Sequence, residues 1–322
     1  MSAQPTDAPP PPHPLLEDGS LVVHVAGDAR LRERVGPWLP RVTHAPPPGA
    51  AARAEIHVYA GAPADAPPAG PPAMEMAGVA GWVLGETVVF ADAAGAVGAR
   101  VDLAARRADV CVRVDGAPAG TVEVVSTLTM VSALLVTRLG RALVHAAAVL
   151  PPGGGAWLLA GGSFSGKTST CVTLIRGGWN WLSDDQVVLG HAAGGVRVEG
   201  WPRRFNLDHG YAEGASQGVR SRVDPDRFGP GEWRGTAPLA GLLFPRVLGD
   251  HPTELVPLHP AGALGLLVRN APWLLADAGG APVVLPLLQQ AARLPAYELR
   301  LGRDSYCDAK RLQSVLAPAV DP

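Results

Sequence analysis

The chain has 322 residues, 47% of them hydrophobic and 17% charged, and its formal net charge at pH 7 is -2. A chain of this length can fold into two domains that each bury a core. The small net charge is not the basic surface typical of nucleic-acid-binding proteins, so we expect no nucleic-acid partner. The three cysteines, Cys111, Cys171 and Cys307, are widely separated, which favours neither a disulfide framework nor a metal cluster and is consistent with a reducing cytoplasm.

Residues 1–14 are rich in proline and lack the charged and apolar regions of a secretory signal. We expect a disordered tail here. No segment approaches the roughly 18 consecutive apolar residues that would indicate a membrane span. The sequence therefore predicts a cytoplasmic protein without a membrane partner.

After the tail, the sequence predicts a small mixed α/β domain at 15–120. A short helix is expected at 28–38. His24 and His57 lie in strand-like runs, where a histidine is more typical of a packed or surface residue than of a ligand, and nothing in this domain indicates chemistry. Its role stays open between recognising an acceptor, self-association and covering the rest of the protein. Alternating apolar residues predict four strands, at 21–25, 55–59, 82–90 and 110–114.

The second domain is expected at 121–322. Apolar residues at helical spacing cover 122–139 and lead into a strand-like run at 143–149 that carries His145. On this pattern alone, such a histidine is more often a hydrogen-bonded structural residue than a functional one.

A phosphate-binding loop follows the apolar run at 157–160. Gly161, Gly166, Lys167 and Thr168 complete the pattern G-x-x-x-x-G-K-[ST], with a helix-compatible run after it. Glycines let successive backbone N–H groups point at phosphate oxygens, and the start of the helix adds the positive end of its dipole. Lys167 would supply charge to the outer phosphates and the Thr168 hydroxyl would bind Mg²⁺. The residues expected to contact the nucleotide are Gly161, Gly162, Ser163, Phe164, Ser165, Gly166, Lys167, Thr168 and Ser169.

Two adjacent acids come after the predicted helix. A glycine pair at 177–178 indicates the helix stop, and a short buried strand at 179–182 then ends in Ser183, Asp184 and Asp185. Beside a phosphate loop, such carboxylates suit two tasks, holding Mg²⁺ and accepting a proton from an attacking hydroxyl. Adjacent strand residues point to opposite sides, so the two need not do the same thing.

The remainder returns to strand character, with two predicted helices. The segment 203–236 has little periodicity and is long enough to be a functional loop over the site. Helices are expected at 260–269 and 305–316. Strands or closing elements are expected at 196–198, 239–244, 254–257, 283–290 and 296–301.

The order of His145, the loop at 161–168 and the pair Asp184 and Asp185 resembles the C-terminal catalytic domain of the bacterial HPr kinase/phosphorylases, and most closely their kinase-only relatives. The likeness is close over 143–189 and loose over the rest of the second half. It implies an α/β P-loop kinase core of the phosphoenolpyruvate carboxykinase and HPr kinase type. It further implies ATP and Mg²⁺ as cofactors and a serine hydroxyl on a peptide or protein as the acceptor.

Carried over by position, the resemblance assigns roles to residues of this chain. Lys167 and Thr168 would bind the phosphates and the metal. Asp184 would be the general base and Asp185 the metal-side carboxylate, although the sequence does not fix which of the two faces the pocket. His145 would lie near the transferred phosphate.

The chain also departs from the family pattern. Phe164 stands where the bifunctional enzymes usually have a second loop glycine, and it would crowd the acceptor side. The family's Glu-Ile-Arg-Gly segment is absent, so the reverse reaction, phosphorolysis, is not implied. In its place, Arg203 and Arg204 are candidates for the cation that steadies the transferring phosphoryl group, and two exposed loop arginines are an equal alternative.

Two other functions remain open at this stage. One is an ATP-binding regulatory or assembly protein without phosphotransfer. The other is a kinase of a small hydroxy compound. A modified-peptide precursor is one acceptor that the resemblance suggests, and the sequence leaves the acceptor and any homo-oligomer undetermined.

Overall fold

The computed structural model divides the chain into two compact units, and the second unit begins at Gly140, after Leu139. Each unit is described by itself. Both are mixed α/β structures. Residues 1–11 of the expected tail, residues 209–219 of the expected loop at 203–236, and Cys307 lie outside the described residues. The structure describes residues 12–40, 51, 53–62, 67–115, 121–201, 203–208, 220–275, 277–306 and 308–320.

The first unit contains an eight-stranded sheet in the order β1-β2-β3-β8-β7-β6-β5-β4. β2, β3 and β8 run parallel, whereas the other neighbours are antiparallel. The strands are β1 (His13–Pro14), β2 (Leu21–Ala26), β3 (Ala54–Ala60), β4 (Met74–Met76), β5 (Val79–Leu84), β6 (Thr87–Asp92), β7 (Val97–Asp102) and β8 (Arg107–Val112).

Two helices, α1 (Ala29–Val35) and α2 (Thr121–Arg138), pack in this unit. Asp28 caps α1 by accepting hydrogen bonds from the backbone of Arg30 and Leu31. We expected the second domain to begin at 121, but α2 packs against β5, β7 and β8 and therefore belongs to the first unit. The boundary consequently falls at the end of this helix and not at about 120.

Two further expectations for the first unit need correction. The tail was expected to reach residue 14, but His13 and Pro14 form β1, which pairs antiparallel with Val22 and Val23. The expected single strand at 82–90 is a hairpin of β5 and β6. The chain reverses direction at Gly85, which has a φ of +65°. Glycine adopts this left-handed conformation at little cost, so it suits a tight hairpin turn.

The second unit contains a nine-stranded sheet built on one long strand, β17 (Thr236–Gly249). Its first residues pair antiparallel with β14, and its later residues pair parallel with β11 and β19. The other strands of this sheet are β9 (Ala142–Val144), β10 (Ala146–Leu150), β11 (Ala156–Ala160), β12 (Asn180–Ser183), β13 (Val187–Ala192), β14 (Gly195–Gly200), β18 (Glu254–Pro257) and β19 (Ala296–Gly302).

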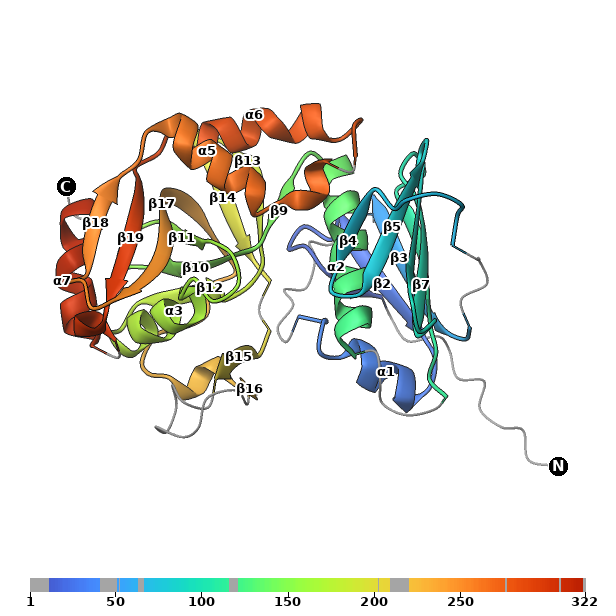
Figure 1. Cartoon of the computed structure of the whole chain (residues 1–322), viewed down its shortest axis with the longest axis horizontal. Coiled ribbons are helices and arrows are strands. Elements are labelled where there is room, and N and C mark those ends of the chain that lie inside the picture. The colour runs from blue at the N-terminus through green and yellow to red at the C-terminus, as the bar shows by residue number, and fades with distance from the viewer. Residues whose placement is uncertain are drawn as a thin grey trace. The chain divides into compact units, whose positions relative to one another are not determined.

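Among the described residues, four helices pack in this unit. α3 (Lys167–Arg176) and α7 (Ala309–Val320) share a core with β10, β11, β17 and β19. α5 (Pro260–Arg269) and α6 (Ala281–Ala291) pack together, away from α3 and α7, as Figure 1 shows. Among the described residues, we find no helix with the length and apolar character needed to cross a membrane.

The predicted elements of the second unit are largely present. The helix expected at 260–269 is confirmed, whereas the terminal helix begins at Ala309 and not at 305. The segment 203–236 is not uniformly irregular, because it contains a hairpin of β15 (Phe205–Asp208) and β16 (Arg220–Val223) and a short 3-10 helix at Pro225–Arg227. Buried Phe205 and Leu207 attach this hairpin to the core, which explains the regular structure.

The two ends of β14 give a matched test of backbone packing. A Cβ atom added to Gly200 would collide with the backbone carbonyl of Leu182, whereas one added to Gly195 would meet open space. We expect Gly200→Ala to lower the free energy of unfolding by about 1–3 kcal/mol and Gly195→Ala to change it by less than about 0.5 kcal/mol. Urea unfolding measures both, and equal effects would contradict this account of the β12–β14 contact.

Candidate functional site

The phosphate-type loop lies between β11 and α3. All five residues of β11 are buried beside parallel β17, and the chain leaves this strand at Gly161. Gly166 has a φ of +99° and precedes α3, which begins at Lys167. A Cβ atom at Gly166 would lie 2.8 Å from Leu301, so both the backbone conformation and the space require glycine.

The Lys167 side chain lies against the first residues of the loop. Its Nζ atom donates hydrogen bonds to the carbonyl oxygens of Gly161, at 2.6 Å, and Gly162, at 2.9 Å. Burial lowers the pKa of Lys167, and the charges of Asp185 and Asp184 partly offset this effect. The ammonium group is therefore held where the loop curls and within electrostatic reach of the acid pair.

The rest of the loop is more exposed. Gly162, Ser163 and Phe164 face solvent, while Thr168 and Ser169 are half-buried in the first turn of α3. Phe164 is 82% exposed and has a φ of +64°. A non-glycine residue in this left-handed region carries a backbone cost of about 1–2 kcal/mol. Phe164 therefore holds a backbone conformation that glycine adopts more easily.

The acid pair lies where β12 ends. The Ser183 hydroxyl donates to the Trp201 carbonyl at 3.0 Å and accepts from the backbone N–H of Gln186 at 3.3 Å. These bonds fix the turn that carries Asp184 and Asp185. Asp184 is buried, with an exposed fraction of 3%, whereas the Asp185 side chain is 44% exposed.

Asp185 contacts two side chains that come from other parts of the chain. The Nδ1 atom of His145 lies 3.1 Å from Oδ1 of Asp185, and Nη2 of Arg203 donates to its Oδ2 at 3.1 Å. The backbone N–H of His145 donates to the Asn270 carbonyl, which anchors the histidine between β9 and β10. The structure therefore brings His145 and the acid pair together, as the sequence led us to expect.

The pKa values of the two carboxyl groups are shifted in opposite directions. Burial, together with the charge of Asp185, raises the pKa of Asp184 to about 8. Burial also acts to raise the pKa of Asp185, but the hydrogen bond from His145 and the charges of Arg203 and Lys167 outweigh it and hold this pKa well below its usual range. Asp185 is consequently the ionised member of the pair at neutral pH, and Asp184 is largely protonated.

Arg203, and not Arg204, makes the contact with the acid pair. The Arg203 side chain is 8% exposed, whereas Arg204 faces solvent. The sequence contains a signal for this difference between the two arginines. Phe205 and Leu207 are apolar and face the core, and Arg203 lies on their side of an extended chain, whereas Arg204 lies on the other side. Arg204 lies within electrostatic reach of Arg222 on β16, whose pKa is lowered by burial and by both of these arginines.

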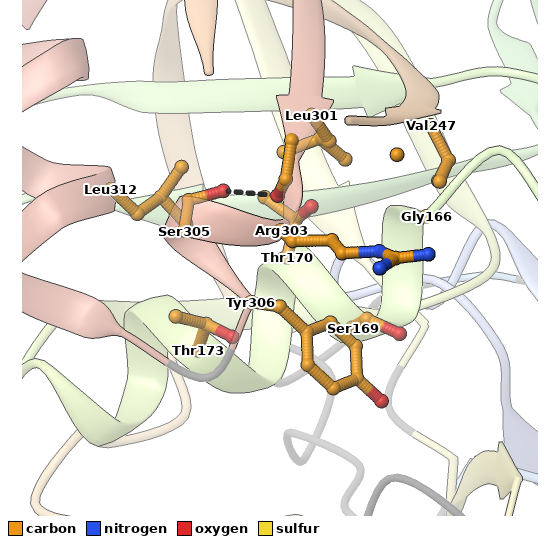
Figure 2. Close-up of a pocket in the computed structure, with 12 residues that line it drawn as sticks. Gly166, Ser169, Thr170, Thr173, Val247, Leu301, Arg303, Ser305, Tyr306 and Leu312 are labelled. Carbon is orange, nitrogen blue, oxygen red and sulfur yellow. Dashed lines mark hydrogen bonds between the residues drawn. The ribbon is translucent and has the colours of Figure 1, made fainter. Parts of the chain in front are cut away.

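A small cavity lies against the first turns of α3 and has a volume of about 140 Å³. Figure 2 shows the Tyr306 ring next to Ser169, with Arg303 extending across the cavity. The sequence did not indicate this cavity, because its walls come from segments without a shared motif. The side chains that line it are mainly apolar or hydroxyl-bearing, and they include Ser169, Thr170, Thr173, Val247, Leu301, Arg303, Ser305, Tyr306 and Leu312.

The groups near the loop fit a hard divalent cation. The Thr168 hydroxyl and the ionised carboxylate of Asp185 are oxygen ligands of the kind that Mg²⁺ prefers. His145 and Arg203 already hold one orientation of that carboxylate. These residues would bind the metal that the sequence led us to expect.

Comparison with known proteins adds no assignment. The chain matches no protein-family model and no curated protein.

The acid pair predicts an unusual dependence of stability on pH. A carboxyl pKa of about 4 in the unfolded chain and about 8 in the folded chain means that the folded state binds the extra proton between these values. The contribution of Asp184 to stability is therefore present at low pH and is lost as the pH rises. Asp184→Asn removes this loss. We therefore expect the free energy of unfolding of the variant, relative to that of the wild type, to rise by at least about 1 kcal/mol from pH 5 to pH 8.5.

Urea unfolding in the presence of a metal chelator measures this difference at both pH values. Asp250→Asn is the control, because the Asp250 side chain is 88% exposed. The account fails if the two variants show the same pH dependence.

Proposed function

We propose that the protein is an ATP-dependent kinase of HPr kinase type, which transfers the γ-phosphate to a serine hydroxyl of a peptide or protein. The observation that carries this proposal is the convergence of Lys167, in the mouth of the loop, with an acid pair whose exposed member contacts both His145 and Arg203. A phosphate-binding loop alone indicates only a nucleotide site. Paired carboxylates beside it are what transfer to a hydroxyl requires.

The charges near the loop support an anionic ligand. Lys167 and Arg203 contribute two positive charges, and Asp185 contributes one negative charge while Asp184 stays largely protonated. The positive end of the α3 dipole adds to the same region. Loop amides and Lys167 would hold the outer phosphates, and bound Mg²⁺ would offset their charge.

The acidities of the two acids support separate roles. Asp185, with its lowered pKa, is a weak base and a good metal ligand, whereas Asp184 has a pKa that suits proton transfer near neutrality. We therefore assign the ionised form of Asp184, which a pKa of about 8 makes the minor form at pH 7, to take the proton from the attacking hydroxyl. His145 orients Asp185, and Arg203 supplies a cation close to where the transferred group would lie.

The cavity beside α3 is the proposed nucleoside site. In a loop of this pattern the backbone amides cradle the α- and β-phosphates, and the lysine reaches the β- and γ-phosphates. The sugar and base therefore leave the loop on the side away from the γ-phosphate. A cavity bounded by Ser169, Thr170 and the Tyr306 ring suits a flat, partly apolar base.

Removal of Lys167 tests nucleotide binding. We expect Lys167→Ala to weaken ATP binding on the order of 100-fold, because a charged hydrogen-bond donor to phosphate is lost. Isothermal titration calorimetry with Mg²⁺ and ATP measures the affinity. Lys310→Ala is the matched control, because Lys310 is the other lysine of the chain and is exposed. Equal affinities for the two variants would exclude the loop as the ATP site.

Asp184→Asn tests the transfer step. We expect this variant to retain ATP binding and to lose transfer by roughly 100-fold or more, because the general base is removed. Asp185→Asn should instead raise the Mg²⁺ concentration that half-saturates activity. Unchanged transfer in Asp184→Asn would disprove the assignment of the base.

The acceptor is found by supplying γ-labelled ATP and Mg²⁺ together with peptides encoded beside the gene, and by following the label with mass spectrometry. Label on a peptide serine supports the proposal and identifies the acceptor. Label on a small hydroxy compound changes the substrate class. Tight ATP binding without transfer favours a regulatory ATP-binding protein.

Tyr306→Ala tests the nucleoside site. Loss of an aromatic surface for stacking should weaken ATP binding by roughly 5- to 10-fold and leave the affinity for pyrophosphate unchanged, because pyrophosphate occupies only the loop. Competition binding with both ligands measures the two affinities. A parallel loss for pyrophosphate would mean that Tyr306 acts on the loop and not on the base.

A further inference from the structure

One face of the first unit's sheet carries three side chains with metal-binding atoms. His24 lies on β2 and is the direct neighbour of His57 on parallel β3. Glu55 precedes His57 by two residues and therefore shares its face. Buried Val23, Val25, Ile56 and Val58 point to the opposite face. The sequence did not indicate this grouping, because the two histidines are separated by the whole β2–β3 crossover.

The geometry places the three groups within reach of one ion. The imidazole rings of His24 and His57 are stacked, with centroids 4.6 Å apart and planes 9° from parallel. Nε2 of His57 lies 3.0 Å from Oε2 of Glu55, and one ligand atom from each of the three residues lies within 4.8 Å of the others. Tetrahedral Zn²⁺ with bonds of about 2.0–2.1 Å separates its ligand atoms by roughly 3.4 Å. Binding would therefore require the side chains to rotate until the in-plane lone pairs of both rings point at one ion.

A second observation points to a missing partner at this place. Nε2 of His24 is shielded from solvent and makes no hydrogen bond with any group among the described residues. Buried polar atoms in folded proteins nearly always have a partner. A metal ion bound at Nε2, in the plane of the ring, would supply one for His24.

The surrounding charges permit a cation. Arg107 on β8 lies across from Glu55 and brings a positive charge, but Nη2 of this arginine contacts Oδ1 of Asp109 at 3.3 Å. Asp109 is itself the neighbour of His57 across the β3–β8 pair, so a carboxylate balances the arginine.

We propose that His24, Glu55 and His57 form a Zn²⁺ site that ties β2 to β3. Two imidazole nitrogens and one carboxylate are a donor set that suits Zn²⁺, with the fourth position left to water. The site is separate from the phosphate loop and does not depend on the proposed kinase activity. Its expected role is to stabilise the first unit.

The test is a titration of the full-length, chelator-treated protein with ZnCl₂ in competition with a chromophoric chelator. We expect one ion per chain at this site, with affinity at least tenfold lower in Glu55→Gln and His57→Ala and at least 100-fold lower in the variant that lacks both histidines. His191→Ala serves as a control on an exposed histidine. His145→Ala is a second control, because His145 and Asp185 form another pair that can bind metal.

Two readouts keep the test decisive if a variant folds poorly. Co²⁺ in place of Zn²⁺ should give the visible absorption of a tetrahedral site in the wild type and in His145→Ala, but not in Glu55→Gln. Zn²⁺ should also raise the midpoint of thermal unfolding of the wild type more than that of Glu55→Gln. Equal Zn²⁺ affinity in the wild type and in the variant without both histidines would overturn the proposal, as would loss of binding in His145→Ala alone.

Discussion

The contacts that Asp185 makes with His145 and Arg203 determine much of the site's geometry. A half-exposed carboxylate between two such groups has little freedom to turn, and its pKa falls because the ionised form gains both contacts. The charge on Asp185 in turn helps to raise the pKa of its neighbour Asp184, where burial already disfavours ionisation. The same contacts thus leave Asp185 ionised and Asp184 largely protonated, although the two side chains are chemically identical. Both lie within electrostatic reach of the Lys167 ammonium group.

Backbone hydrogen bonds keep the contributing segments in place. The N–H of Trp201 donates to the Gln186 carbonyl, and the Ser183 hydroxyl donates back to Trp201, so that the turn of the acid pair and the segment of Arg203 are joined twice. The N–H of Trp181 donates to Glu232, which ties β12 to the chain beyond the β15–β16 hairpin. These bonds matter because charged side chains are positioned only as well as the backbone that carries them.

The sequence predicted features that depend on consecutive residues, and it missed features that depend on contacts between distant segments. The loop was readable from the glycines and Lys167 because its geometry depends on consecutive residues. His145 and Asp185 are 40 residues apart, so their direct contact follows only from the folded sheet. Helix α2 was placed in the wrong unit for the same reason, since helical spacing gives no information about which sheet its apolar face will cover. The pairing of His24 with His57 likewise depends on strand order, which periodicity alone does not supply.

Phe164 connects the conformation of the loop to the acceptor side of the proposed reaction. Its left-handed backbone carries a cost that glycine would avoid, and a ring that is 82% exposed regains little of it through packing. Strained residues of this kind persist where the surrounding structure fixes the backbone, and they cluster at functional sites. Here the buried strand β11 and the start of α3 fix both ends of the loop. The Phe164 ring at the rim of the loop therefore offers an apolar surface to any partner that binds there. A glycine in the same backbone conformation would not provide this surface.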